Sequence, residues 1–155
     1  MSLCRFHADQ NFRLLYRASE DSFNSASFHQ KCDGIKNTLT IIKTTHDYIF
    51  GGFTGAAWNS AGNYIYDTNS FIFSLVNNLN SPFKAKCMNN HDSIYGSSVY
   101  LATFGAGHDL CINSDSNLDQ NSYSNFGKSY GRPGIFLAGF DHFQTTEIEV
   151  FEKLD

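Results

Sequence analysis

Apolar residues occupy both faces of the segment 38–53, which is the clearest structural pattern in the chain. Its first arm, residues 38–44, is almost wholly β-branched or aliphatic, and its second arm, residues 48–53, is rich in aromatic residues. Thr45-His46-Asp47 between them suits a short turn. Strands that are apolar on both faces lie inside a domain. The pattern predicts a buried β-hairpin, in which Gly51-Gly52 marks either a bulge or the close approach of another backbone.

Short apolar runs bounded by turn residues continue along the chain and predict a meander of further strands. These predicted strands cover residues 14–18, 71–76, 83–87, 94–95, 99–101 and 110–112. An apolar piece at 136–139 and a strand at 146–154 close the chain, and the strand carries glutamates on one face. Residues 58–69 and 113–133 are predicted loops. The second is so long and so poor in aliphatic residues that it indicates a functional segment.

One helix is predicted after the first strand. Asn24 can cap its N-terminus, while Phe28, Cys32 and Ile35 share one face at the spacing i, i+4, i+7. Gly34 is placed to end the helix in a left-handed conformation. A single short helix among many short strands predicts a mainly β fold of the α+β class.

The composition agrees with a folded, phenylalanine-rich globule of one domain covering residues 1–155. Charged residues make up only 17% of the chain, and Asn and Ser supply polarity in their place. Such residues belong in turns between short strands, which again favours a β-rich fold. No internal repeat and no interdomain linker is visible.

The charge pattern limits the possible partners and the compartment. The net charge is −4, and the eleven Lys and Arg are scattered, so nucleic acid is not an expected partner. No apolar run is long enough for a signal peptide or a membrane span, so membrane insertion is not expected. The four cysteines are widely spaced, and no glycosylation sequon occurs. We therefore expect a cytoplasmic protein, monomeric as an isolated domain.

Each cysteine has a histidine three or four positions away, which raises the possibility of a zinc site. The pairs are Cys4 with His7, His29 with Cys32, Cys87 with His91, and His108 with Cys111. Structural zinc sites need paired ligands flanked by turns that converge on one point, and this arrangement is not evident here. Buried thiols and surface imidazoles are the favoured interpretation, and no metal or cofactor is predicted.

A cysteine nucleophile could be built from Cys32 with His29 or from Cys111 with His108. A nucleophilic thiol needs a lowered pKa and an orienting group, but Cys32 lies at the C-terminal end of the predicted helix, where the helix dipole disfavours a thiolate. Core packing is therefore the favoured role of Cys32.

Three other motifs are candidate chemical sites. The segment Gly105-Ala106-Gly107-His108-Asp109 lacks a third glycine at the spacing of a phosphate loop, so a turn with positive φ angles is favoured. Residues 115–126 begin like a calcium-binding loop, but Gln120 and Phe126 stand where glycine and glutamate are required. Glu147 and Glu149 share a strand face and could act as an acid–base pair, although a solvated face or a charged edge is the commoner role.

Together these segments resemble the TLDc domain family over nearly the whole chain, from about residue 12 to residue 151. The matching pieces are residues 14–19, 28–34, 38–43, 48–53, 58, 71–75, 104–110, 121–125, 136–139 and 147–151, in the family's order. The resemblance implies a two-sheet antiparallel β-sandwich flanked by short helices. The helical segment that precedes Leu14-Leu15-Tyr16 in relatives is short here.

The resemblance also implies resistance to oxidative stress and binding to the vacuolar proton pump, the V-ATPase. The family brings no agreed catalytic centre, although Cys32, His108, Asp109, Glu147 and Glu149 lie in its motif blocks. The leading hypothesis is a non-catalytic protein-interaction domain that presents loops, including 113–133, to a V-ATPase subunit. The alternative is a peroxide-consuming or hydrolytic enzyme that uses a Cys/His pair or the paired glutamates.

Overall fold

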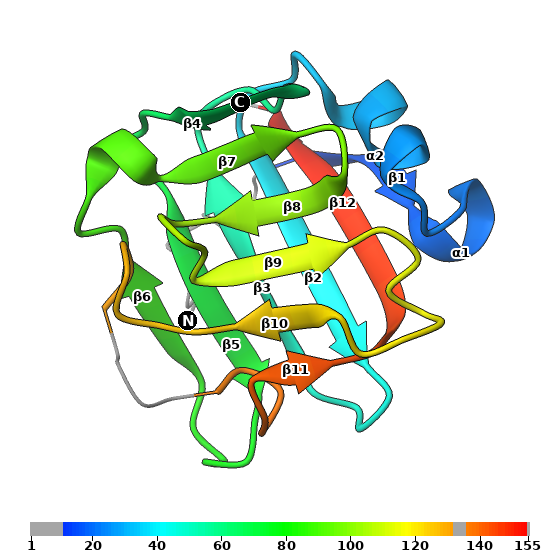
Figure 1. The fold of residues 1–155 in the computed structure, drawn as a ribbon, viewed down its shortest axis with the longest axis vertical. Coiled ribbons are helices and arrows are strands. Elements are labelled where there is room, and N and C mark those ends of the chain that lie inside the picture. The colour runs from blue at the N-terminus through cyan, green and yellow to red at the C-terminus, as the bar shows by residue number, and fades with distance from the viewer. Residues whose placement is uncertain (1–10, 132–135, 155) are drawn as a thin grey trace.

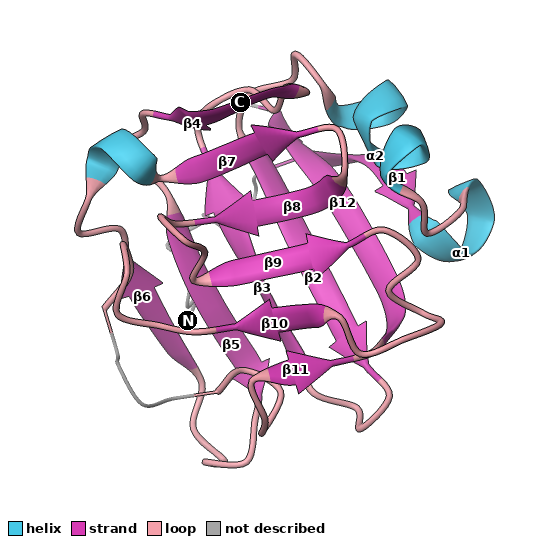
Figure 2. Ribbon diagram, viewed as in Figure 1, coloured by secondary structure: helices cyan, strands magenta, loops and turns pink. Residues whose placement is uncertain are grey.

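A computed structural model of the chain describes residues 11–131 and 136–154, which form two antiparallel β-sheets packed face to face (Figures 1 and 2). The strands of the first sheet are, in spatial order, β1 (Asn11–Arg17), β12 (Thr145–Leu154), β2 (Thr38–Thr44), β3 (Ile49–Thr54), β5 (Phe71–Val76) and β6 (Phe83–Lys86). The second sheet follows the order β11 (His142–Phe143), β10 (Ser122–Ser124), β9 (Leu110–Asn113), β8 (Tyr100–Phe104), β7 (Ile94–Ser97) and β4 (Ala61–Ile65). The predicted two-sheet sandwich is confirmed.

Among the described residues, three short helical segments flank the sheets: α1 (Ala18–Asp21), α2 (Ser25–Cys32) and the 3-10 turn η1 (Asn90–Asp92). The predicted helix is α2, and its cap forms as expected, because the Asn24 side chain accepts a hydrogen bond from the Ser27 N–H at 2.8 Å. Gly34 follows with φ of +81°, as predicted for the residue that ends the helix. None of these described helices is long and apolar enough to cross a membrane.

The predicted hairpin lies at the centre of the first sheet, where β2 and β3 pair continuously from Thr38↔Thr54 to Lys43↔Ile49. Ile42 faces the other sheet and is fully buried. On the opposite face, Leu39 and Ile41 pack beside a second apolar cluster formed by Phe53, Phe71 and Phe73. Both faces of the hairpin are therefore occupied by apolar contacts, as the sequence pattern predicted.

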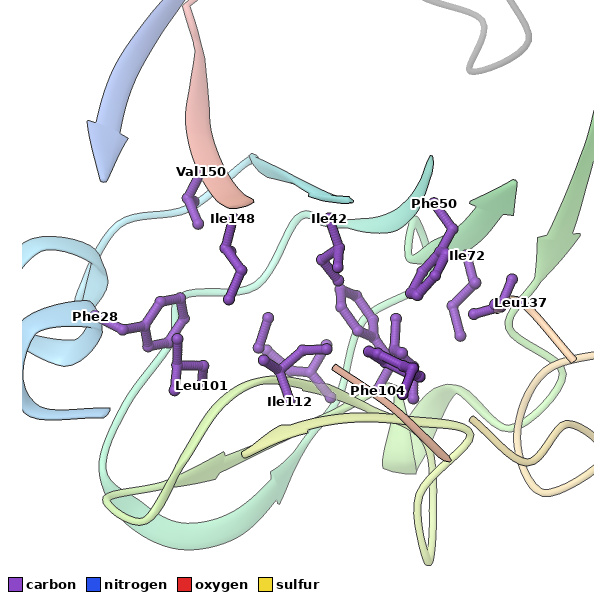
Figure 3. Packing of buried hydrophobic residues seen from close by; sticks show 14 of the residues in the cluster. Phe28, Ile42, Phe50, Ile72, Leu101, Phe104, Ile112, Leu137, Ile148 and Val150 are labelled. Carbon is purple, nitrogen blue, oxygen red and sulfur yellow. The ribbon is translucent and has the colours of Figure 1, made fainter. Parts of the chain in front are cut away.

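The main core fills the space between the sheets (Figure 3). The first sheet contributes Ile42, Phe50, Ile72, Ile148 and Val150, and the second contributes Leu101, Phe104 and Ile112. Phe28 reaches the core from α2, where its ring meets those of Tyr16 and Trp58 edge-on at 5.8 and 5.7 Å. The helix is thus held against one end of the sandwich by aromatic packing.

The glycine pair in β3 marks close approach rather than an interrupted strand. A Cβ atom on Gly51 would lie 1.8 Å from the carbonyl oxygen of Thr40, and one on Gly52 would lie 2.5 Å from the ring of Phe104. Gly52 therefore lets an aromatic ring of the second sheet rest directly on the backbone of the first.

We predict that Gly52→Ala destabilises the domain by about 1–3 kcal/mol, since the new methyl group overlaps the Phe104 ring in a packed core. Denaturant unfolding would measure this loss. Adding Phe104→Leu should make the combined loss smaller than the sum of the two single losses, because the clash is removed. Gly131→Ala is the matched control, as its Cβ would meet no atom within 4 Å. If the losses of stability from Gly52→Ala and Phe104→Leu simply add in the double variant, the proposed contact between Gly52 and the Phe104 ring would be contradicted.

Two segments predicted as loops contain strands. Residues 58–69 include β4, an edge strand whose first four residues are exposed, and residues 113–133 include β10, the three polar residues Ser122-Tyr123-Ser124. Neither strand has the alternation of apolar and polar residues that identifies a strand in a sequence. Both are strands because they form hydrogen bonds with neighbouring strands, and not because their side chains are buried. The apolar piece at 136–139 forms a turn in which Leu137 and Ala138 are buried.

Candidate functional site

Cys32 lies on α2 with no exposed surface. Burial, followed by the nearby carboxylates of Asp33 and Asp21, raises the pKa of its thiol to about 12. A nucleophilic thiol requires the opposite shift. The structure thus places Cys32 in the core, as its sequence context predicted.

His29, the proposed partner of Cys32, uses both of its ring nitrogens elsewhere. Nδ1 lies 2.6 Å from Oδ1 of Asp33, and Nε2 lies 2.7 Å from the carbonyl oxygen of Tyr100, to which it donates. Neither nitrogen is therefore placed to take a proton from the Cys32 thiol. The contact instead ties α2 to β8 of the second sheet.

In the second candidate pair, both Cys111 and His108 make contacts with other groups. Leu110 and Ile112 face the core, so the intervening Cys111 lies on the outward face of its sheet, where other side chains cover it completely. Burial raises the pKa of its thiol to about 12, and Thr103 donates a hydrogen bond to its sulfur. Nδ1 of His108 lies 3.0 Å from the carbonyl oxygen of Gly105.

Asp109 holds a segment of backbone in place. Its buried carboxylate accepts hydrogen bonds from the backbone N–H groups of Lys128, Ser129 and Tyr130, at 3.0, 2.8 and 3.2 Å. Burial raises the pKa of the Asp109 carboxyl, and the backbone donors offset part of that rise. Gly105, with φ of +88°, is required because a Cβ there would lie 1.8 Å from Oδ1 of Asp109. The predicted positive-φ turn is confirmed, and its aspartate is an anchor for residues 128–130.

Glu147 and Glu149 lie on the same outward face of β12, as predicted, and both line a shallow hollow of about 170 Å³. Glu147 accepts hydrogen bonds from the backbone N–H and the hydroxyl of Ser19, at 3.1 and 2.5 Å. Glu149 forms an ion pair with Arg17 at 3.4 Å. Each carboxylate therefore holds the β1–α1 segment against β12, and the Ser19 contact explains a helical turn that the local sequence does not predict.

The cysteine and histidine pairs do not converge on a metal site within the described residues, where no three His, Cys, Asp or Glu side chains are grouped suitably. The described cysteines, Cys32, Cys87 and Cys111, are free thiols. The pair Cys4 and His7 lies outside the described residues. The incomplete calcium loop is a turn, in which the Asp119 carboxylate accepts a hydrogen bond from the Asn121 N–H.

The structure also reveals a hollow of about 340 Å³ that the sequence did not indicate. It lies where the β2–β3 turn meets β11, and its lining includes His46, Phe140, Asp141 and His142. His46 is almost a hundred residues away from the other three. Only the fold brings them together, so no local motif could have predicted this hollow.

Comparison with known families agrees with the architecture. The profile of the TLDc domain matches residues 1–153, nearly the whole chain. The chain belongs to the TLDc domain family. No match was found among curated proteins.

Three of the motif blocks that carry the family resemblance contribute packing and anchoring contacts to this TLDc domain. The block at 104–110 contains the positive-φ turn and the Asp109 anchor, and the block at 48–53 contains the close contact of Gly52 with Phe104. The block at 28–34 contains the cross-sheet contact of His29. These sequence features are therefore explained by the requirements of the fold.

Proposed function

We propose that this TLDc domain is a non-catalytic protein-interaction module of the cytoplasm that binds a V-ATPase subunit and contributes to oxidative-stress resistance. One observation carries the proposal: every candidate catalytic group makes a structural contact or is sealed in the interior. These groups are Cys32, His108, Asp109, Glu147 and Glu149. The alternative, a peroxide-consuming or hydrolytic enzyme, requires an ionised thiol or an unengaged acid–base pair.

The described part of segment 113–133 supplies a suitable binding loop. Residues 114–121 form turns between β9 and β10, and the Leu118 side chain in this segment is 74% exposed. Asp115 beside it is also exposed. Loops on a rigid sandwich are a common way for such folds to bind partners. The net charge of −4 favours a basic patch on the partner and binding that weakens as salt rises.

We predict that Asp115→Asn combined with Leu118→Ser lowers binding to V-ATPase-containing membranes at least fivefold without changing the melting temperature. Co-sedimentation at low and high salt would measure it. Asp115 has φ of +59°, which asparagine also tolerates, so the change removes charge with little strain.

The matched control is Asp47→Asn with Leu79→Ser, which alters another exposed left-handed aspartate and another exposed leucine in turns elsewhere. Equal weakening by both double variants would remove the 114–121 turn from the proposal. Failure of the unaltered domain to co-sediment at low salt would overturn V-ATPase binding itself.

A further inference from the structure

The hollow of about 340 Å³ beside β11 borders the 114–121 turn, because Gln120 lines it, but the function proposed above gives it no role. It lies at the end of the sandwich where the β2–β3 turn meets β11 (Figure 1). Its volume is at the lower limit for pockets that hold a small molecule, so it suits a single side chain or a group of that size. The chemistry of the lining determines which group can fit.

Hydrogen bonds between distant segments hold the walls of the hollow in place. The Thr45 N–H donates to the carbonyl oxygen of Gln144 at 3.0 Å, which ties the β2–β3 turn to the residue between β11 and β12. Nε2 of Gln144 donates to the carbonyl oxygen of Asn117 at 2.6 Å. Nδ1 of His142 donates to the carbonyl oxygen of Gln120 at 3.1 Å. The hollow is therefore formed before a ligand arrives, so binding requires little ordering of the protein.

Three side chains in the lining have an acceptor atom to offer. Since Nε2 of Gln144 is used as a donor, the oxygen of this amide is left to accept. Since Nδ1 of His142 is used as a donor, Nε2 of the neutral ring is an acceptor. Oδ1 of Asp141 accepts from the His142 N–H at 3.0 Å, while Oδ2 receives no hydrogen bond from the described residues. These atoms favour a ligand that donates several hydrogen bonds.

The charge of the hollow favours a cation. Its lining includes the Asp141 carboxylate and, among the described residues, no lysine or arginine. Beside the β2–β3 turn, the ammonium group of Lys43 is paired with Asp47 at 3.6 Å, which compensates its charge. The two histidines of the lining, His46 and His142, add no charge when their rings are neutral. A carboxylate in these surroundings attracts a cation and repels a phosphate or a second carboxylate.

Phe140 adds an exposed aromatic face to the hollow. Its side chain is 67% exposed although it belongs to the lining, and it directly precedes Asp141. A guanidinium group can stack on such a ring and donate to carboxylate and amide oxygens at the same time, because its five N–H groups lie in one plane. An ammonium group has three donors and is more strongly hydrated. An exposed ring beside a carboxylate therefore favours arginine over lysine.

We propose that this hollow is a docking pocket for an arginine side chain of a protein partner. The guanidinium group pairs with the Asp141 carboxylate, stacks on the Phe140 ring and donates to the side-chain oxygen of Gln144. The inference deepens the proposed function and in that respect rests on it, because the arginine belongs to the partner that contacts the 114–121 turn. It gives the basic patch expected on that partner a specific residue type.

Titration of the isotope-labelled whole chain with the blocked tripeptide Ac-Gly-Arg-Gly-NH2 at pH 7.5 tests the pocket, with amide chemical shifts as the measurement. We expect saturable shifts of the amides of residues 44–46 and 138–144, with half-saturation at about 20 mM. The same peptide with citrulline, which is neutral and nearly isosteric with arginine, should cause no saturable shift. The peptide with lysine should bind at least twofold more weakly than the peptide with arginine.

Two variants test the residues that form the pocket. Asp141→Asn and Phe140→Leu should each weaken binding of the arginine peptide at least threefold. Asparagine can still accept from the His142 N–H, and leucine keeps an apolar side chain at an exposed position, so both variants should fold. Asp47→Asn and Phe136→Leu are the matched controls, because these exposed residues are close in sequence but do not line the hollow. Both controls should bind within twofold of the unaltered chain.

Equal binding of the citrulline peptide would overturn the proposal, as would equal losses in the test variants and their controls. Stronger shifts of the same amides by inorganic phosphate would also overturn it, since they would show an anion site. The outcome for V-ATPase binding is separate. If the peptide binds but the domain does not co-sediment with V-ATPase-containing membranes, the arginine pocket stands and the V-ATPase is not the partner. If the domain co-sediments but the peptide causes no shift, the pocket alone is refuted.

Discussion

Asp109→Asn should destabilise the domain by about 2–4 kcal/mol, although the side chain keeps its size. The carboxylate accepts hydrogen bonds at both oxygens from three backbone N–H groups and is fully buried. An asparagine replaces one oxygen with an NH2 group, so a donor would then face backbone donors without water to separate them. Urea unfolding at neutral pH measures the loss. Asp109→Glu should also be destabilising, because the tight approach to Gly105 leaves no room for another methylene.

The loss should also be localised. Hydrogen exchange of the Lys128, Ser129 and Tyr130 amides should accelerate by at least an order of magnitude beyond the change in global stability, since these are the groups that lose an acceptor. Asp119→Asn is the matched control, because its carboxylate accepts from one N–H in an exposed turn. A stability change of less than 1 kcal/mol in Asp109→Asn, with turnover of a peroxide or ester lost, would instead support the enzyme interpretation.

The sequence was most informative where local chemistry decides local structure. The two-sided apolar pattern of 38–53 identified the central hairpin, and Asn24 and Gly34 identified both ends of α2. In each case the determining residues lie within about fifteen positions of one another. The hydrophobic pattern and the capping residues are sufficient to predict such local structure, because the side chains that determine it are neighbours along the chain.

Structure that depends on distant partners was less predictable. The strand β10 has no hydrophobic period, and it is ordered by pairing with β9 and β11. In the turn α1, the Ser19 N–H donates to the carboxylate of Glu147, more than a hundred residues away. The family resemblance predicted the two-sheet sandwich, but it could not distinguish residues required by the fold from residues of a catalytic site. Asp109, for example, lies in a motif block, but only the structure shows that its carboxylate accepts hydrogen bonds from residues 128–130.

The other large effect is expected at alkaline pH. Burial raises the pKa of both Cys32 and Cys111 to about 12 in the folded state, from an ordinary value of 9.0. A thiol with a raised pKa favours the folded state while it stays protonated in both states. As the pH rises above 9, the unfolded chain releases these protons and the folded chain retains them. Stability is therefore lost progressively between pH 9 and about 12.

Each of the two thiols should contribute a slope approaching about 1.4 kcal/mol per pH unit, or about 2.7 kcal/mol together. Denaturant unfolding at half-unit intervals from pH 8 to 11 would measure the slope. Tyr123, with a pKa raised to about 12 mainly by burial, adds to it above pH 10. A domain of ordinary stability, about 5–15 kcal/mol, should thus approach unfolding near the top of this range.

Cys32→Ala and Cys111→Ala separate this linkage from a loss of packing. Each variant should lower the free energy of unfolding at neutral pH by a constant amount. Each should also reduce the slope of this free energy against alkaline pH by the contribution of one thiol. Ile42→Val shortens a core side chain and removes no titratable group. It should lower the free energy of unfolding equally at every pH and leave the alkaline slope unchanged. An unchanged slope in both alanine variants would contradict protonated, buried thiols. Rapid alkylation of native Cys32 at pH 7 would do so more directly, and it would restore the thiol enzyme as a candidate function.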